Sequence, residues 1–177
     1  MPQVSIVTPC YNSEKFIRDT INSVLSQTYK DWEWIITDDC SKDDSTKIIE
    51  NIKDERIKLI KLDQNKGAAN AYNTSLKNAT GRYITFIDSD DIWDENFLEE
   101  MTYFLIKNDE ELVHCGYRRK DENLEPLLPD FSPNKKVTFN SLLYSCTLST
   151  LATMYDSKRI GKNIFLTTTK EKIILCC

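Results

Sequence analysis

The chain has 177 residues and a formal net charge of −5, with 40% hydrophobic and 29% charged residues. This composition is typical of a globular domain with a sizeable core. The acidic balance argues against a nucleic-acid partner, because such proteins usually carry a basic surface.

The N-terminus and the cysteines bear on cellular location. No apolar run approaches the roughly 20 residues of a membrane span, and the first residues lead into a strand pattern without a signal peptide. The six cysteines form no C-x-x-C pair, and the single histidine, His114, has no partner at zinc-site spacing. We therefore expect free thiols in a cytoplasmic protein that has no transmembrane segment but can bind peripherally to a membrane.

Strand and helix patterns alternate over the first 115 residues. Short β-branched runs predict strands, and apolar residues at intervals of three and four predict helices. In chain order we expect a strand at 4–8, a helix at 17–25, a strand at 32–37, a helix at 45–52, a strand at 57–62, a helix at 68–79, a strand at 83–87, a helix at 97–105 and a strand at 111–115.

Small polar residues and one glycine are expected to mark the helix ends. Asn12 or Ser13 is the expected N-cap of the first helix, and Asp94 caps the last, because such side chains accept bonds from free backbone N–H groups. Gly81 is the expected C-terminal cap of the helix at 68–79.

The alternation predicts an α/β fold with a mostly parallel sheet flanked by helices on both faces. From about Lys120 the pattern weakens, and Pro126, Pro129 and Pro133 punctuate a polar loop. We expect a core at 1–117, this loop at 118–136, and an incomplete C-terminal subregion at 137–177 that begins near Val137.

Polar clusters follow three of the expected strands. Residues 8–12 follow the first strand, residues 38–39 the second, and residues 88–91 the fourth. The carboxyl ends of parallel strands share one edge of a sheet, where ligands bind in open α/β folds. We therefore expect up to five carboxylates to converge on one crevice, those of Asp38, Asp39, Asp88, Asp90 and Asp91.

Carboxylates that lie close together repel one another unless a positive charge lies among them. Magnesium or manganese is commonly held by one or two carboxylates plus substrate phosphates, and the D-x-D spacing of Asp88 and Asp90 suits such an ion. The alternative is that these acids only cap a helix or form turns. The sequence has neither G-x-G-x-x-G nor G-x-x-x-x-G-K-[ST], so dinucleotide-binding and P-loop alternatives lack their phosphate-binding loops.

Five motifs together resemble the family 2 glycosyltransferases, which have the Rossmann-like GT-A fold. They are VSIVTPCYN at 4–12, SVLSQTY at 23–29, DDCS at 38–41, NKG at 65–67 and GRYITFIDSDDIW at 81–93. Their order and spacing both fit, and the strong part of the resemblance covers residues 3–106.

The resemblance implies sugar transfer from a nucleotide-sugar donor, often a UDP-sugar, to a saccharide or lipid-linked acceptor, with inversion at the anomeric carbon. It also implies a divalent metal, Mn²⁺ or Mg²⁺, and commonly a role in surface polysaccharide synthesis; a homo-oligomer stays open. By similarity Asp90, with Asp91, holds the metal and Asp88 faces the ribose or sugar. The other residues implied in the donor site are Pro9, Tyr11, Asn12, Gly67 and, as the base contact, one acid of the pair Asp38 and Asp39.

Three features depart from the family pattern. Cys40 replaces the usual glycine at a turn, which we interpret as a mild change. Tyr72 stands where many members carry an arginine that helps to bind the nucleotide, and packing on its helix is the expected role of Tyr72. The acidic motif that supplies the general base is absent after residue 162, so we assign no catalytic residue. Because residues 163–177 contain one acid, Glu171, we expect this segment to be read in a shifted frame, as part of a truncated longer enzyme.

Three other functions stay open. A nucleotide-sugar-binding module without its base would bind the donor but not turn it over. A nucleotidyltransferase would show a glycine-rich, basic N-terminal loop, and residues 8–13 are neither. In a plain α/β interaction domain the acids would serve only as caps, and a nucleoside diphosphate would give no metal-dependent protection.

Overall fold

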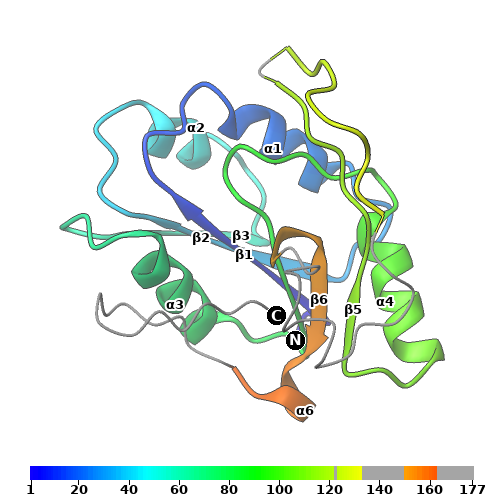
Figure 1. Ribbon diagram of the computed structural model, residues 1–177. Helices are drawn as coiled ribbons and strands as arrows, with labels where there is room; N and C mark the ends of the chain where they lie inside the picture. Colours follow the sequence, from blue (N-terminus) through cyan, green and yellow to red (C-terminus); the bar gives the residue numbers. More distant parts are fainter. Residues whose placement is uncertain (122, 133–149, 163–177) are drawn as a thin grey trace, which may run out of the picture.

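A six-stranded sheet forms the centre of the computed structural model, which describes residues 1–121, 123–132 and 150–162 (Figure 1). The strand order is β3-β2-β1-β4-β6-β5. Strands β1 to β4 are mutually parallel, whereas β6 runs antiparallel to both of its neighbours. The strands are β1 (Val4–Cys10), β2 (Trp32–Asp38), β3 (Ile57–Lys61), β4 (Tyr83–Phe86), β5 (Leu112–His114) and β6 (Thr153–Asp156). The predicted α/β class and mostly parallel sheet are confirmed.

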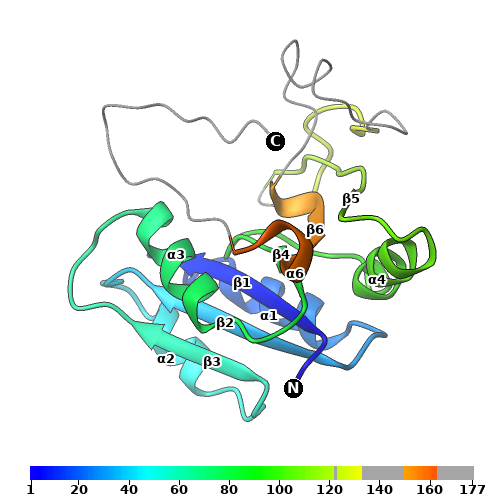
Figure 2. The same cartoon turned by 90° about the horizontal axis from the view of Figure 1, so that it is seen from below.

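Helices cover both faces of this sheet, as Figure 1 and the turned view in Figure 2 show. Helices α1 (Ile17–Leu25), α2 (Ser45–Glu50) and α4 (Phe97–Lys107) pack on one face, and α3 (Ala68–Asn78) packs on the other. A short 3₁₀ turn, η1 (Thr150–Ala152), precedes β6, and α6 (Ser157–Ile160) follows it.

Burial on both faces explains the apolar strands. In β2, Trp32, Trp34 and Ile36 join the core under α1, α2 and α4, while Ile35 joins the core under α3. Successive side chains of a strand point to opposite faces, so a strand covered on both sides is mainly apolar on both, and its polar side chains need hydrogen-bond partners. Every residue of β2 is accordingly buried, including Glu33.

The predicted helix caps are wrong. Helix α1 begins after Phe16, whose N–H, like that of Ile17, bonds to the backbone carbonyl of Ser13, so a turn rather than a side chain starts the helix. Helix α4 begins after Asn96, and the Asp94 carboxylate accepts from Arg118 at 2.7 and 2.8 Å instead of capping the helix.

Gly81 is not the cap of α3, which ends at Asn78 with Ala79 as its C-cap. Instead Gly81 lies against the start of β1, and its N–H donates to the Ser5 hydroxyl at 2.8 Å. A Cβ at this position would lie 2.7 Å from the backbone nitrogen of Ser5. Close approach of two backbones is the physical reason for a glycine here.

Strand β6 comes from the segment that the sequence analysis assigns to the C-terminal subregion, yet it lies in the same sheet as β1 to β4. The division of the chain at 117 and 136 stays a prediction. The start of the subregion near Val137 and the shifted-frame tail at 163–177 lie outside the described residues.

Two further sequence expectations concern thiols and membranes. Cys10, Cys40 and Cys115 are free thiols, and the other three cysteines lie outside the described residues. Within the described part of the chain, no helix is both long and apolar enough to cross a bilayer.

Candidate metal and nucleotide site

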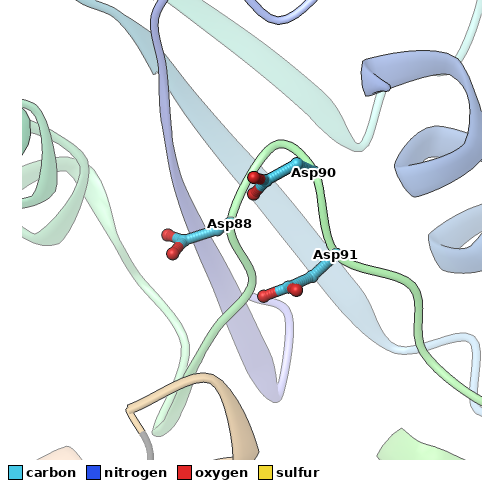
Figure 3. A group of neighbouring side chains, drawn as sticks. All are labelled: Asp88, Asp90 and Asp91. Atoms are coloured by element: carbon cyan, nitrogen blue, oxygen red, sulfur yellow. The ribbon is translucent and has the colours of Figure 1, made fainter. Parts of the chain in front are cut away.

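Three carboxylates meet in the loop that follows β4. Ligand oxygens of Asp88, Asp90 and Asp91 lie within 4.8 Å of one another. A turn in which the Asp91 N–H donates to the Asp88 carbonyl at 3.2 Å brings the side chains together. Figure 3 shows the three side chains around this turn. Asp90 is exposed, whereas Asp88 and Asp91 are partly buried.

The electrostatics of this acidic cluster are unfavourable without a cation. Burial, together with the charges of Asp88 and Asp90, raises the pKa of Asp91 to about 6. Burial also raises the pKa of Asp88, and the Asp90 charge adds to the effect, against the hydrogen bond from Tyr72 that lowers it. No lysine or arginine within the described ranges forms an ion pair with any of the three.

The donor set fits a hard divalent cation. Oδ2 of Asp91 is buried and has no hydrogen-bond partner among the described residues. A buried carboxylate oxygen without a partner costs free energy, which a cation would recover. Carboxylate oxygens are the ligands that Mg²⁺ and Mn²⁺ prefer, and such ions are commonly completed by substrate phosphates and water.

Hydrogen bonds from β1 and from the loop after it hold the acidic loop in place. The Thr8 hydroxyl donates to the Ile87 carbonyl at 2.7 Å and accepts from the Trp34 indole at 2.8 Å. Ser13 and Ser89 share a hydroxyl hydrogen bond of 2.6 Å. These supports were not predicted from the sequence, although Thr8 and Trp34 stand out there as polar groups in strands that should be fully buried.

Asp38 and Asp39 do not belong to the group of three carboxylates whose ligand oxygens lie within 4.8 Å of one another, and the convergence of all five on one crevice stays a prediction. Asp39 accepts from the backbone N–H groups of Lys66 at 2.9 Å and Gly67 at 2.7 Å. Asp38 accepts from the N–H of Ser41 at 3.0 Å. Backbone N–H groups thus bind both carboxylates, and each residue is 2% exposed. Oδ1 of Asp38 is buried without a hydrogen-bond partner among the described residues.

The loop that follows β1 lies beside the loop that follows β2. Pro9 is opposite Thr37 in the register of β1 and β2. Tyr11 is 47% exposed, and Asn12 bridges to the second loop, where its Oδ1 accepts from the Lys42 N–H at 2.8 Å. These residues are thus at the carboxyl edge of the sheet, as predicted; their contact with a donor stays a prediction.

Two residues that depart from the family pattern occupy informative positions. Cys40 has a φ of 65°, in the left-handed region that favours glycine, so this change is less mild than expected. Tyr72 does pack on its surroundings, with its ring 5.7 Å from that of Phe86, but its hydroxyl also donates to Oδ1 of Asp88. The expected role of Tyr72 as packing alone is therefore incomplete.

A cavity of about 650 Å³ opens next to the acidic cluster. Asp90 and Asp91 line one part of it, and the segment 115–121 lines another. The wall combines aromatic and cationic side chains, including Trp93, Phe97, Tyr117, Arg118, Arg119 and Lys120. This cavity is large enough for one or two sugar-sized groups.

The mostly parallel sheet with an acidic loop at its carboxyl edge is the arrangement of the GT-A fold. The sequence model of the family described as "Glycosyl transferase family 2" matches residues 5–161 of this chain. The chain therefore belongs to glycosyl transferase family 2.

Similar proteins carry related names. The chain is 36% identical over 163 residues to a putative teichuronic acid biosynthesis glycosyltransferase, TuaG of Bacillus subtilis, covering 91% of this chain and 65% of that protein. It is 38% identical over 172 residues to WfgD of Escherichia coli, a UDP-Glc:α-D-GlcNAc-diphosphoundecaprenol β-1,3-glucosyltransferase, covering 97% of this chain and 67% of that protein. The chain thus spans about two thirds of the length of these relatives.

A solved structure shows the same fold. TarS of S. aureus, residues 1–349 in complex with UDP, superposes with a TM-score of 0.76 at 25% identity, covering 93% of this chain and 50% of that one. The predicted GT-A fold is confirmed by this similarity.

Proposed function

We propose that the chain binds a nucleotide-sugar donor, most simply a UDP-sugar, and serves a metal-assisted, inverting sugar transfer in surface polysaccharide synthesis. The observation that carries the proposal is the acidic cluster at the carboxyl edge of the sheet. Ligand oxygens of its three carboxylates lie within 4.8 Å of one another, and Oδ2 of Asp91 is buried without a hydrogen-bond partner among the described residues. The UDP bound by TarS and the UDP-Glc in the name of WfgD support the choice of nucleotide.

Each residue has a proposed part. Asp90 and Asp91 would hold the divalent ion, Mn²⁺ or Mg²⁺. Asp88 would face the ribose or sugar, and one of its oxygens lies close enough to those of Asp90 and Asp91 to share the same ion. When bound, the ion supplies Lewis-acid stabilisation of a departing nucleoside diphosphate. Asp38 is the better base contact of its pair, because its Oδ1 lacks a partner whereas both oxygens of Asp39 are engaged. Pro9, Tyr11, Asn12 and Gly67 shape the rest of the donor pocket.

We place the acceptor in the cavity beside Asp90 and Asp91. A lipid-linked acceptor, as in the name of WfgD, would bring its reacting hydroxyl to the donor from this side, with the protein working at the cytoplasmic face of a membrane. The aromatic walls of Trp93 and Tyr117 suit the apolar faces of a sugar ring. No general base is assigned.

A thermal-shift titration tests the donor site. UDP, GDP and UDP-glucose would each be added with Mn²⁺, with Mg²⁺ and with a chelator. A nucleoside diphosphate at about 100 times its Kd stabilises the protein by roughly 2.7 kcal/mol. We expect that shift only with metal, and absence of a shift under every condition rules out the donor site. Sugar release from UDP-glucose separates an active transferase from a binding module that lacks its base.

A further inference from the structure

Tyr72 connects the helix on one face of the sheet to the acidic cluster. It lies in α3, and its hydroxyl donates to Oδ1 of Asp88 in the loop after β4. A carboxylate has about four lone-pair sites, so this hydrogen bond leaves Asp88 able to bind a cation as well.

The Tyr72 ring is fixed by its neighbours. It meets the Phe86 ring edge-on, with an interplanar angle of 75°, and Phe86 stacks on Tyr155 with ring centroids 6.2 Å apart. Aromatic pairs in such geometries have defined orientations, so the row of three rings restricts where the hydroxyl of Tyr72 can point. Burial and the Asp88 charge raise the pKa of the Tyr72 phenol, so it stays a neutral donor.

We propose that Tyr72 is a positioning residue that orients the charged Asp88 carboxylate for a divalent cation without adding positive charge to the site. A lysine or arginine at position 72 would also donate to Asp88, but its charge would compete with the metal. Among the described residues no cation pairs with Asp88, Asp90 or Asp91, so the bound ion is the main countercharge there. The inference rests on the donor-site function proposed above.

Two substitutions separate the hydroxyl from the ring and from the charge. Tyr72→Phe keeps the ring and removes the donor, and Tyr72→Arg keeps a donor and adds a charge. Tyr155→Phe is the matched control, because it removes a hydroxyl from the same aromatic row at a residue outside the cluster. Mn²⁺ binding by each full chain would be measured by isothermal titration calorimetry, first without nucleotide and then with UDP, alongside the melting temperature.

We expect Tyr72→Phe to weaken Mn²⁺ binding by about 10-fold or more, since removing the partner of a metal ligand typically costs about 10- to 100-fold. Tyr72→Arg should weaken Mn²⁺ binding at least as much and should increase UDP binding in the presence of a chelator. Tyr155→Phe should bind Mn²⁺ like the wild type.

Wild-type Mn²⁺ affinity in Tyr72→Phe, with only a lower melting temperature, would show that Tyr72 merely packs and would overturn the inference while leaving the donor site intact. Unchanged Mn²⁺ affinity in Tyr72→Arg would contradict the claim that a positive charge at position 72 competes with the metal ion. If the wild-type chain binds neither Mn²⁺ nor UDP, the proposed function fails as well.

Discussion

The carboxylate of Asp39 accepts a 2.7 Å hydrogen bond from the backbone N–H of Gly67. Its other oxygen accepts from Lys66, so Asp39 joins the end of β2 to the start of α3. Because α3 carries Tyr72, this bond also helps to set the distance between the helix and the acidic cluster. Asp39 thus has a structural task apart from any contact with a base.

Asp39→Ala should destabilise the protein by about 1 to 2 kcal/mol, because the backbone N–H groups of Lys66 and Gly67 lose a charged acceptor in partly buried contacts. Asp39→Asn should cost less, since the amide oxygen can still accept one of the two bonds. The free energy of unfolding from urea titration is the measurement. The neighbouring exposed Asp63 offers a control, and Asp63→Ala should stay within about 0.5 kcal/mol of the wild type. Equal losses for Asp39→Ala and Asp63→Ala would contradict the role of this bond.

Asp90→Asn and Asp91→Asn should both abolish the stabilisation that Mn²⁺ gives, but they should differ without metal. Asp90 is exposed, so its substitution should change the metal-free free energy of unfolding by less than about 0.5 kcal/mol. Asp91 is partly buried beside two like charges, so Asp91→Asn should stabilise the metal-free protein by about 1 kcal/mol. A clear loss of stability in Asp90→Asn, with metal binding retained, would favour a capping role for the acids.

Glu33 should make the stability depend on pH. Burial would raise its pKa, but bonds from Lys58, Thr80 and Ser5 outweigh it and lower the pKa of Glu33 to about 2. The folded-state pKa lies below the unfolded value, so the stabilisation is present above about pH 4.5 and is lost as the pH falls toward 2.

Urea unfolding at several pH values between 7 and 2 would measure this contribution, which we expect to be about 3 kcal/mol. The variant Glu33→Gln should be less stable than the wild type at pH 7, and the difference should shrink as the pH is lowered. A difference that stays constant over this range would mean that the charge of Glu33 does not stabilise the fold.

Gly81→Ala should cost about 3 kcal/mol, because the new Cβ would overlap backbone as well as side-chain atoms at the start of β1. The double variant Ser5→Ala with Gly81→Ala tests the cause. It removes the hydroxyl 2.8 Å from the new carbon but leaves the backbone nitrogen at 2.7 Å, so stability should not be rescued. Full rescue in thermal unfolding would show that the flexible side chain alone made the contact.

The strands that carry the site could be predicted from the sequence because they are buried on both faces. Both central strands, Val4–Cys10 and Trp32–Asp38, are buried on both faces, and the apolar residues in each of them predict such burial. Asp88, Asp90 and Asp91 are close in sequence, and a single turn brings them together, so their cluster was also predictable.

Contacts between distant segments were not predictable in this way. The placement of Asp39 depends on N–H groups in the loop before α3, and the contact of Tyr72 with Asp88 depends on how α3 packs on the sheet. Strand β6 is short, and its place in the sheet depends on its pairing with β4 and on the ion pair between Arg82 and Asp156. The local sequence pattern does not identify partners that are distant along the chain. The separate hydrogen bonding of Asp38 and Asp39 and the antiparallel strand β6 could therefore not be predicted from it.

The position of β6 between β4 and β5 has a consequence for synthesis on the ribosome. When β4 emerges, one of its edges has no neighbour, because the strand that pairs with it is encoded well downstream, at Thr153–Asp156. Until then the nascent chain exposes an open strand edge, which is a template for pairing with other chains. Closure of the sheet therefore has to wait until β6 has been made, and conditions that delay translation between β5 and β6 should raise aggregation.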